Sequence, residues 1–237
     1  AQKVEFKPWG VGNLMLSGQH AIYLVDGMSQ SDQHYLVDYT IDVLTKELSE
    51  KNAEPSVILM KDFAPDELFT KKAGVGTPFY DFLVQPNMIL KIRDHWKSFK
   101  DYLGDMTSKY RVRYKRAKKK LGNIERREMF KLYQEIANSA GFNLFILSPD
   151  SIPEMKRVIG EKVMINWFCL EGRLIGYTTL VKNHHESEAH FLGFENELNF
   201  SHQLYLNMLY DMVEESINMG VKYLNYSRTA SEIKSSV

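Results

Sequence analysis

The sequence predicts an α+β fold, because an antiparallel meander of strands is followed by an amphipathic helix and a further strand. Three strand candidates follow one another at 162–171, 173–183 and 188–194, and Gly172 gives a tight hairpin signal between the first two. Apolar residues then recur at helical spacing over about 200–219, and "VKYLNYS" reads as the next strand. This order predicts a mixed sheet flanked by helices.

Helices precede these strands. Residues 95–121 have helical periodicity, and Gly104 or the pair Thr107-Ser108 is expected to break them into two helices. A further helix is predicted at 125–140, and "SIPEM", with Ser151 as its N-cap, predicts a short helix before the meander.

The first half of the chain has a helix of its own at 32–50. Its strand candidates are 12–18, 21–25, 55–63 and two extended pieces within 79–92. We therefore predict an N-terminal α/β domain at 1–94 and a C-terminal α+β domain at 95–237.

Composition is that of an ordinary globular protein. The 237 residues carry 30 Lys plus Arg and 30 Asp plus Glu, so no overall field attracts polyanions. Neither a membrane-spanning apolar run nor a signal sequence is recognised, and we expect a cytoplasmic protein. Cys169 is interpreted as a buried small hydrophobe. The adjacent His184 and His185 do not direct both rings to one ion, so no metal is expected.

The basic run "KYRVRYKRAKKK" at 109–120 is the exception to this neutrality. On a helix, Lys109, Arg113, Arg116 and Lys120 share one face. Nucleic-acid binding through this run is one hypothesis, with Tyr110 and Tyr114 interleaved. The neutral overall charge makes a nucleic-acid partner unlikely.

Four strings carry a resemblance to a known family. They are "GNLMLSGQHAIYL", "YRVRYKRAKKKL", "LEGRLIGY" and "LNYSRTASEIKSS". Together with the element order, they resemble bacterial predicted N-acyltransferases of the GNAT superfamily, which are related to the Fem-type aminoacyl transferases. The resemblance implies a GNAT-like (acyl-CoA N-acyltransferase) fold, with two tandem GNAT-like domains as in the Fem branch.

The resemblance also raises a question about the sheet. The sequence given reaches Val237 soon after the strand at 221–227, before the last two strands of a complete GNAT sheet. Either the protein continues, or those strands are missing, or the N-terminal half supplies the edge.

The function implied is transfer of an acyl or aminoacyl group from a thioester or ester to an amine. The expected acceptor is an anionic small molecule or an envelope- or lipid-linked amine, with peripheral contact to the inner membrane in the lipid case. Acyl-CoA is the expected co-substrate, with aminoacyl-tRNA as the other candidate donor. This chain departs from the GNAT phosphate loop, since "ENELNFSHQ" at 195–203 lacks glycine. The amides of Ser201, His202 and Gln203 are the remaining candidates for phosphate binding.

The resemblance places a base on or just after the third meander strand, at His190 or Glu195. Strand alternation would put His190, Leu192 and Phe194 on one face. Tyr226 is a candidate general acid for the leaving group.

The remaining candidates would bind an anionic substrate. They are Asn225, Arg228 and Lys234 after the last strand, and Arg113 and Arg116 on the basic helix. The alternative to an enzyme is a catalytically degenerate GNAT-fold binding module.

Overall fold

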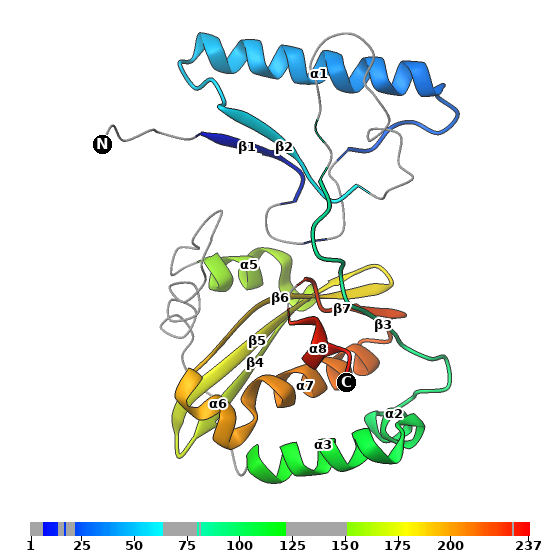
Figure 1. The fold of residues 1–237 in the computed structure, drawn as a ribbon, viewed down its shortest axis with the longest axis vertical. Coiled ribbons are helices and arrows are strands. Elements are labelled where there is room, and N and C mark those ends of the chain that lie inside the picture. Colours follow the sequence, from blue (N-terminus) through cyan, green and yellow to red (C-terminus); the bar gives the residue numbers. More distant parts are fainter. Residues whose placement is uncertain are drawn as a thin grey trace. The chain divides into compact units, whose positions relative to one another are not determined.

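The computed structural model describes residues 7–13, 17, 22–63, 80, 82–121, 151–228 and 230–237. The chain divides into two compact units, Ala1–Gln85 and Pro86–Val237, called unit 1 and unit 2 below (Figure 1). The division lies before strand β3 (Ile89–Lys91) rather than after residue 94, because β3 pairs with a strand near the C-terminus. The helix predicted at 125–140 lies outside the described residues, as does most of the strand candidate at 12–18.

Unit 1 contains a β-α-β arrangement. Strand β1 (Pro8–Val11) pairs in parallel with β2 (Val57–Met60), and α1 (Gln30–Glu50) lies between them in sequence. The predicted helix at 32–50 and the strand within 55–63 are confirmed. The strand expected at 21–25 is wrong, since the described part of it has no strand pairing.

Unit 2 is built on a five-stranded mixed sheet in the order β3-β7-β6-β5-β4. The strands are β4 (Val163–Leu170), β5 (Arg173–Asn183), β6 (Glu186–Phe194) and β7 (Tyr223–Asn225), together with β3. All neighbours are antiparallel except β6 and β7, which are parallel. The predicted α+β class and the meander are therefore confirmed.

The connection between β5 and β6 is shorter than the polar loop predicted from "HHESE". Pairing continues from Val181 opposite Glu188 to Asn183 opposite Glu186, so only His184 and His185 remain in the turn. His184 adopts φ 49°, which a tight turn of this kind requires.

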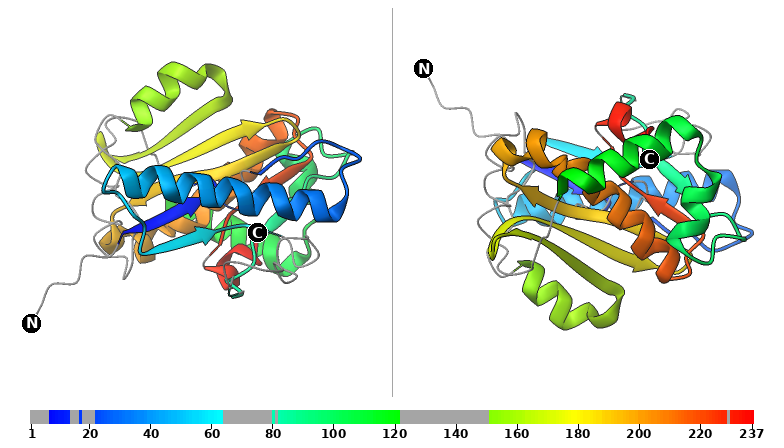
Figure 2. Two further views of the ribbon diagram at one scale, coloured as in Figure 1. Left: turned by 90° about the horizontal axis from the view of Figure 1, so that it is seen from above. Right: turned by 90° about the horizontal axis from the view of Figure 1, so that it is seen from below.

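Helices cover both faces of the sheet (Figure 2). On one face lies α7 (Leu204–Asn218), packed with α2 (Phe99–Asp105) and α3 (Ser108–Leu121). On the other lies α5 (Ser151–Ile159), whose Ile152 packs with Tyr177 of β5. Within the described residues, no helix is long and apolar enough to cross a membrane.

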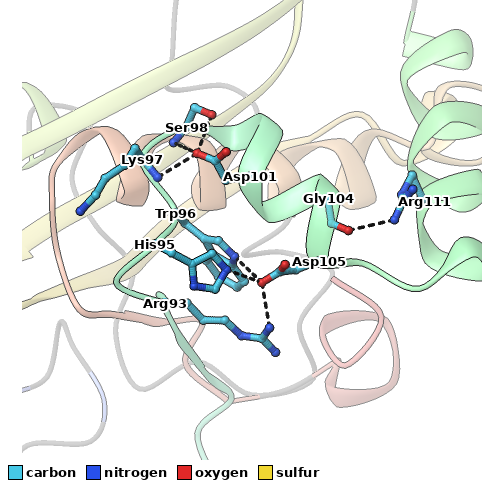
Figure 3. A network of polar contacts seen from close by, with 9 residues as sticks. All are labelled: Arg93, His95, Trp96, Lys97, Ser98, Asp101, Gly104, Asp105 and Arg111. Carbon is cyan, nitrogen blue, oxygen red and sulfur yellow. Dashed lines mark hydrogen bonds and ion pairs between the residues drawn. The ribbon is translucent and has the colours of Figure 1, made fainter.

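A polar network fixes the chain where it enters α2 (Figure 3). The Asp105 carboxylate accepts hydrogen bonds from Trp96 at 2.8 Å, His95 at 2.7 Å and Arg93 at 2.8 Å. The Trp96 bond, followed by the His95 bond, lowers the pKa of Asp105. The network therefore ties the segment before α2 to the end of that helix.

The break predicted between 95 and 121 is confirmed, because α2 ends at Asp105 and α3 begins at Ser108. The guanidinium of Arg111 donates to the carbonyl oxygens of Gly104 at 2.9 Å and Met106 at 2.7 Å. Figure 3 shows the first of these bonds. Because helix C-termini leave carbonyls unpaired, Arg111 acts as a cap for α2.

The helix predicted over about 200–219 is confirmed by α7, but residues 200–203 do not continue it. Instead, α6 (Asn196–His202) and α7 are separated by Gln203, which has a left-handed φ of 50°. Two asparagines favour this break, since the Asn199 side chain accepts from Tyr205 N and the Asn207 side chain donates to the carbonyls of His202 and Gln203. Hydropathy periodicity does not detect such side-chain to backbone bonds.

The sheet edge beside β7 is occupied by β3, a segment from before α2. The pairing joins Ile89 to Asn225 and Lys91 to Tyr223. Of the alternatives open from the sequence, an edge strand from earlier in the chain is therefore the one seen in unit 2.

Candidate functional site

The two parallel strands β6 and β7 separate after a short pairing. Their register runs from Glu186 opposite Tyr223 to Glu188 opposite Asn225, although β6 continues to Phe194. Beyond this point the chain stays beside β3, since Tyr226 N donates to the Met88 carbonyl at 2.8 Å. The last residues of β6 therefore have an edge without a strand partner in β7.

A β-bulge interrupts β6 next to this separation. The register with β5 shifts between Thr178 and Leu180, which leaves Thr179 opposite both His190 and Phe191. The Thr179 hydroxyl accepts from Phe191 N at 2.7 Å and donates to Phe191 O at 2.8 Å. The bulge is thus held by a threonine side chain.

The bulge changes which side chains share a face. Phe191 packs with the cluster under α5, whereas Leu192 and Phe194 pack on the α7 side. Leu192 and Phe194 therefore share a face opposite Phe191, as predicted. The prediction is wrong only for His190, because the extra residue of the bulge places it beside Phe191, with the two ring centroids 4.3 Å apart.

The backbone of Leu192 is directed toward the open edge of β6. The amides of Phe191 and Glu195 bond to β5, since Phe191 N donates to the Thr179 hydroxyl and Glu195 N donates to the Ile175 carbonyl at 2.9 Å. Amides along a strand point alternately to its two sides, so the Leu192 N–H points away from β5. Leu192 has no register partner in β7. Its amide is a candidate donor to a negatively charged oxygen.

Glu188 is a buried carboxylate at the last parallel pair, with 1% of its surface exposed. Alternation places it on the face opposite Ser187, whose hydroxyl lies 2.7 Å from that of Ser216 in α7. Burial raises the pKa of Glu188, the Asn183 side chain donating at 3.4 Å lowers it, and the charge of Glu186 raises it. A buried carboxyl group with a raised pKa is a candidate proton acceptor or donor.

Sequence reasoning did not single out Glu188. The available signal was a charged residue inside a predicted strand, two positions before His190. Such a residue is rarely buried without a reason.

His190 lies in the bulge, two residues after Glu188. Burial lowers its pKa to about 4, so the imidazole is neutral at pH 7. Its Nδ1 lies 3.4 Å from the Thr179 hydroxyl, and its Nε2 is a buried atom without a hydrogen bond among the described residues. A group with this pKa is a weak base.

Glu195, the second predicted base, has a different environment. It is the N-cap residue of α6, and its carboxylate forms an ion pair with Arg173. The ion pair occupies one carboxylate oxygen. These contacts argue against Glu195 as the base.

Tyr226 is placed in the core. It is buried, and its hydroxyl donates to the carbonyl oxygen of Leu209 at 2.9 Å. Burial, with the nearby Tyr102, raises its pKa well above the ordinary value. The geometry therefore argues against its predicted role as a general acid.

Lys234 holds the exit from β7. Lys234 is 6% exposed. Its ammonium donates to the carbonyl oxygens of Tyr226 and Arg228, both at 2.6 Å, and lies 3.5 Å from that of Ser227. Burial lowers the pKa of Lys234 to about 8. Because its donors are already used, Lys234 is a structural residue and not the predicted anion-binding one.

Asn225 and Arg228 remain near the separation of the strands. Asn225 is buried, and its side-chain oxygen accepts from Ser227 N at 2.9 Å, which shapes the turn. Arg228 is half-buried, and burial lowers its pKa. Arg228 follows β7, as predicted, whereas Asn225 is the last residue of that strand and the register partner of Glu188.

Ser201, His202 and Gln203 do not form a helix start. The first two belong to the last turn of α6, and Gln203 joins α6 to α7. The start of α6 carries Glu195 and Glu197, whose negative charges would repel a phosphate. The prediction of phosphate binding by 201–203 is therefore not supported.

Arg113 and Arg116 lie on α3 and are exposed. They are not part of the Glu188 and His190 cluster, because α3 packs on the α7 side of the sheet. No group of His, Cys, Asp or Glu that could hold a metal ion occurs in the described part of the chain.

No family model matches this chain, and no curated protein matches it. Among solved structures, it is similar to L-PGS from Bacillus licheniformis, with a TM-score of 0.34 and 13% sequence identity over 60% of this chain. The match covers 45% of that chain, so the present chain spans less than half of its length. A likeness of this size carries no argument about the reaction, which must be argued from the residues above.

Proposed function

We propose that unit 2 is a GNAT-like N-acyltransferase, which moves an acyl or aminoacyl group from a thioester or ester to an amine. The proposal is based on one observation. Strand β6 separates from β7 after Glu188, so this buried carboxylate lies near a strand edge where the Leu192 N–H has no partner in β7. Acyl transfer requires a base for the amine and a hydrogen-bond donor for the developing oxyanion.

The residues divide these tasks. The neutral amine of the acceptor attacks the donor carbonyl, and the Glu188 carboxylate takes one proton from its nitrogen. The Leu192 N–H stabilises the oxyanion. A C–N bond forms, the C–S or C–O bond of the donor breaks, and the proton held by Glu188 goes to the leaving group. Neutral His190 orients a reactant through its Nε2.

The donor and acceptor classes follow from charge. The acidic start of α6 disfavours a CoA pyrophosphate at that helix, although acyl-CoA remains a candidate co-substrate beside an aminoacyl ester. Arg228, close to the strand separation, is suited to an anionic group of the acceptor. We therefore propose an amine acceptor that also carries a phosphate or carboxylate, free or linked to a lipid.

The test compares Glu188→Gln with the wild-type protein. Acetyl-CoA, a long-chain acyl-CoA and aminoacyl-tRNA would be offered as labelled donors, with glycerophosphoethanolamine or phosphatidylethanolamine as acceptor. We expect Glu188→Gln to lower kcat about 100- to 10,000-fold, the range for loss of a general base.

Glu186→Gln is the matched control, because Glu186 lies two residues earlier in β6 at the turn. It should retain most of the activity. Equal activity of wild type and Glu188→Gln would refute the assignment of the base.

The second candidate is a binding module, which the acidic, glycine-free α6 start favours. Calorimetric binding of a donor by the wild-type protein without any turnover would support that function instead.

A further inference from the structure

The exposed side of α3 carries a continuous line of positive charge. We use the name basic stripe for Lys109, Arg113, Arg116, Lys119 and Lys120, all of them exposed. Their spacings of four, three, three and one place them within one sector of the helix. The opposite side of α3 contains the buried Ala117 and Leu121. The helix is therefore packed on one side and cationic on the other.

Within the residues that the structure describes, the basic stripe has no carboxylate partners, since no Asp or Glu forms an ion pair with its five side chains. Like charges three and four residues apart on a helix repel one another. A negatively charged partner would remove this repulsion. Arg111 is excluded from the stripe because it caps α2.

An exposed aromatic ring lies at the end of the basic stripe. Phe200 of α6 is 86% exposed, and the Lys120 ammonium lies 5.4 Å from its ring centroid. Basic side chains beside an exposed phenylalanine are the combination by which a protein surface binds the headgroup region of a bilayer. Phe200 comes six residues after the end of β6, where the proposed reaction takes place.

The tyrosines of the basic run face inward instead. Tyr114 packs edge-to-face against Phe99 and Tyr210, and Tyr110 is half-buried. Proteins that bind single-stranded nucleic acid use exposed aromatic rings on which bases stack. The inward tyrosines favour a lipid surface over RNA.

We propose that the basic stripe and Phe200 dock unit 2 on the surface of an anionic lipid bilayer. This docking goes beyond the proposed reaction, since it depends on residues of α3 and α6 that take no part in the chemistry. It would bring a membrane-linked acceptor to the open edge of β6 without requiring a membrane-spanning segment.

The test is co-sedimentation of the full chain with vesicles of phosphatidylcholine alone or with about 30% phosphatidylglycerol. We expect binding only to the anionic vesicles, and weaker binding as NaCl is raised. The stripe variant replaces Lys109, Arg113, Arg116 and Lys120 by Gln. Each removed charge should lower the partition coefficient about fivefold, so the loss should exceed about 100-fold.

The matched control removes four exposed lysines elsewhere, Lys51, Lys91, Lys162 and Lys222, again by Gln, and so has the same net charge. It should lose much less binding. Phe200→Ser should lower binding about tenfold, through loss of the inserted ring. Circular dichroism would check that every variant is folded.

Three results would overturn the proposal: wild-type protein that does not bind anionic vesicles, equal losses in the stripe and control variants, or binding of single-stranded RNA without vesicle binding. Glu188→Gln should bind vesicles as the wild type does. Failure of the reaction and failure of docking are thus distinguishable.

Discussion

The half-buried His190 of β6 should make unit 2 less stable in acid. His190 has its pKa lowered to about 4 by burial, whereas an unfolded histidine titrates near 6.5. The unfolded chain therefore binds the proton more readily between these two values. The stabilising contribution of neutral His190 is complete above about pH 6.5 and is lost as the pH falls toward 4.

The size of this effect follows from the pKa difference. The two pKa values differ by about 2.5, and a pKa difference of one corresponds to about 1.36 kcal/mol. The contribution of His190 to the free energy of unfolding is therefore at most about 3 kcal/mol. Glu188 acts in the opposite direction, because its raised pKa makes stability fall as pH rises through that value. The wild-type curve alone would mix the two contributions, so a variant is needed.

His190→Asn removes the imidazole while keeping a polar group near Thr179. Urea denaturation from pH 4 to 7, followed by tryptophan fluorescence, would give the free energy of unfolding of both proteins. We expect the difference between wild type and variant to decrease by up to about 3 kcal/mol as the pH falls. His184→Asn is the control, since His184 is exposed and has the left-handed φ that asparagine tolerates. Parallel curves for wild type and His190→Asn would refute the burial argument.

Two further predictions concern packing. Lys234→Met should lower the free energy of unfolding by about 2–4 kcal/mol, because the carbonyls of Tyr226 and Arg228 lose a charged donor; chemical denaturation beside the exposed Lys162→Met tests this, and similar losses in both would contradict it. Gly176→Ala should lower the free energy of unfolding by about 1–3 kcal/mol, since the new Cβ would clash with the Met208 methyl; a thermal midpoint equal to that of the wild type would show that Met208 moves away freely.

Strands β4 and β5 could be predicted because their apolar residues are continuous and the turn between them carries glycine. At Gly172, for instance, φ is 76°, as the hairpin requires. The helix of the basic run could also be predicted from its periodicity, and Arg113 and Arg116 are exposed, as their spacing indicates. Both patterns depend on neighbours in sequence.

What could not be predicted depends on contacts between distant residues. The bulge at His190 is held by Thr179, eleven residues earlier in the chain. The break at Gln203 is stabilised partly by Asn207, which also donates to the Ala117 carbonyl across to α3. Neither bond leaves a periodic signal. One bulge is enough to reverse which face a strand residue occupies.

The polar string after β7 shows why a site is harder to predict than a fold. Arg228 and Lys234 follow the same strand and both carry a positive charge, yet Lys234 turns inward to hold three carbonyls. Conversely, Glu188 lies inside a strand, where a carboxylate looks structurally unfavourable, and becomes the central residue of the proposed site. The burial and partners of each charged group, which sequence does not contain, therefore decide whether it supports the fold or meets a substrate.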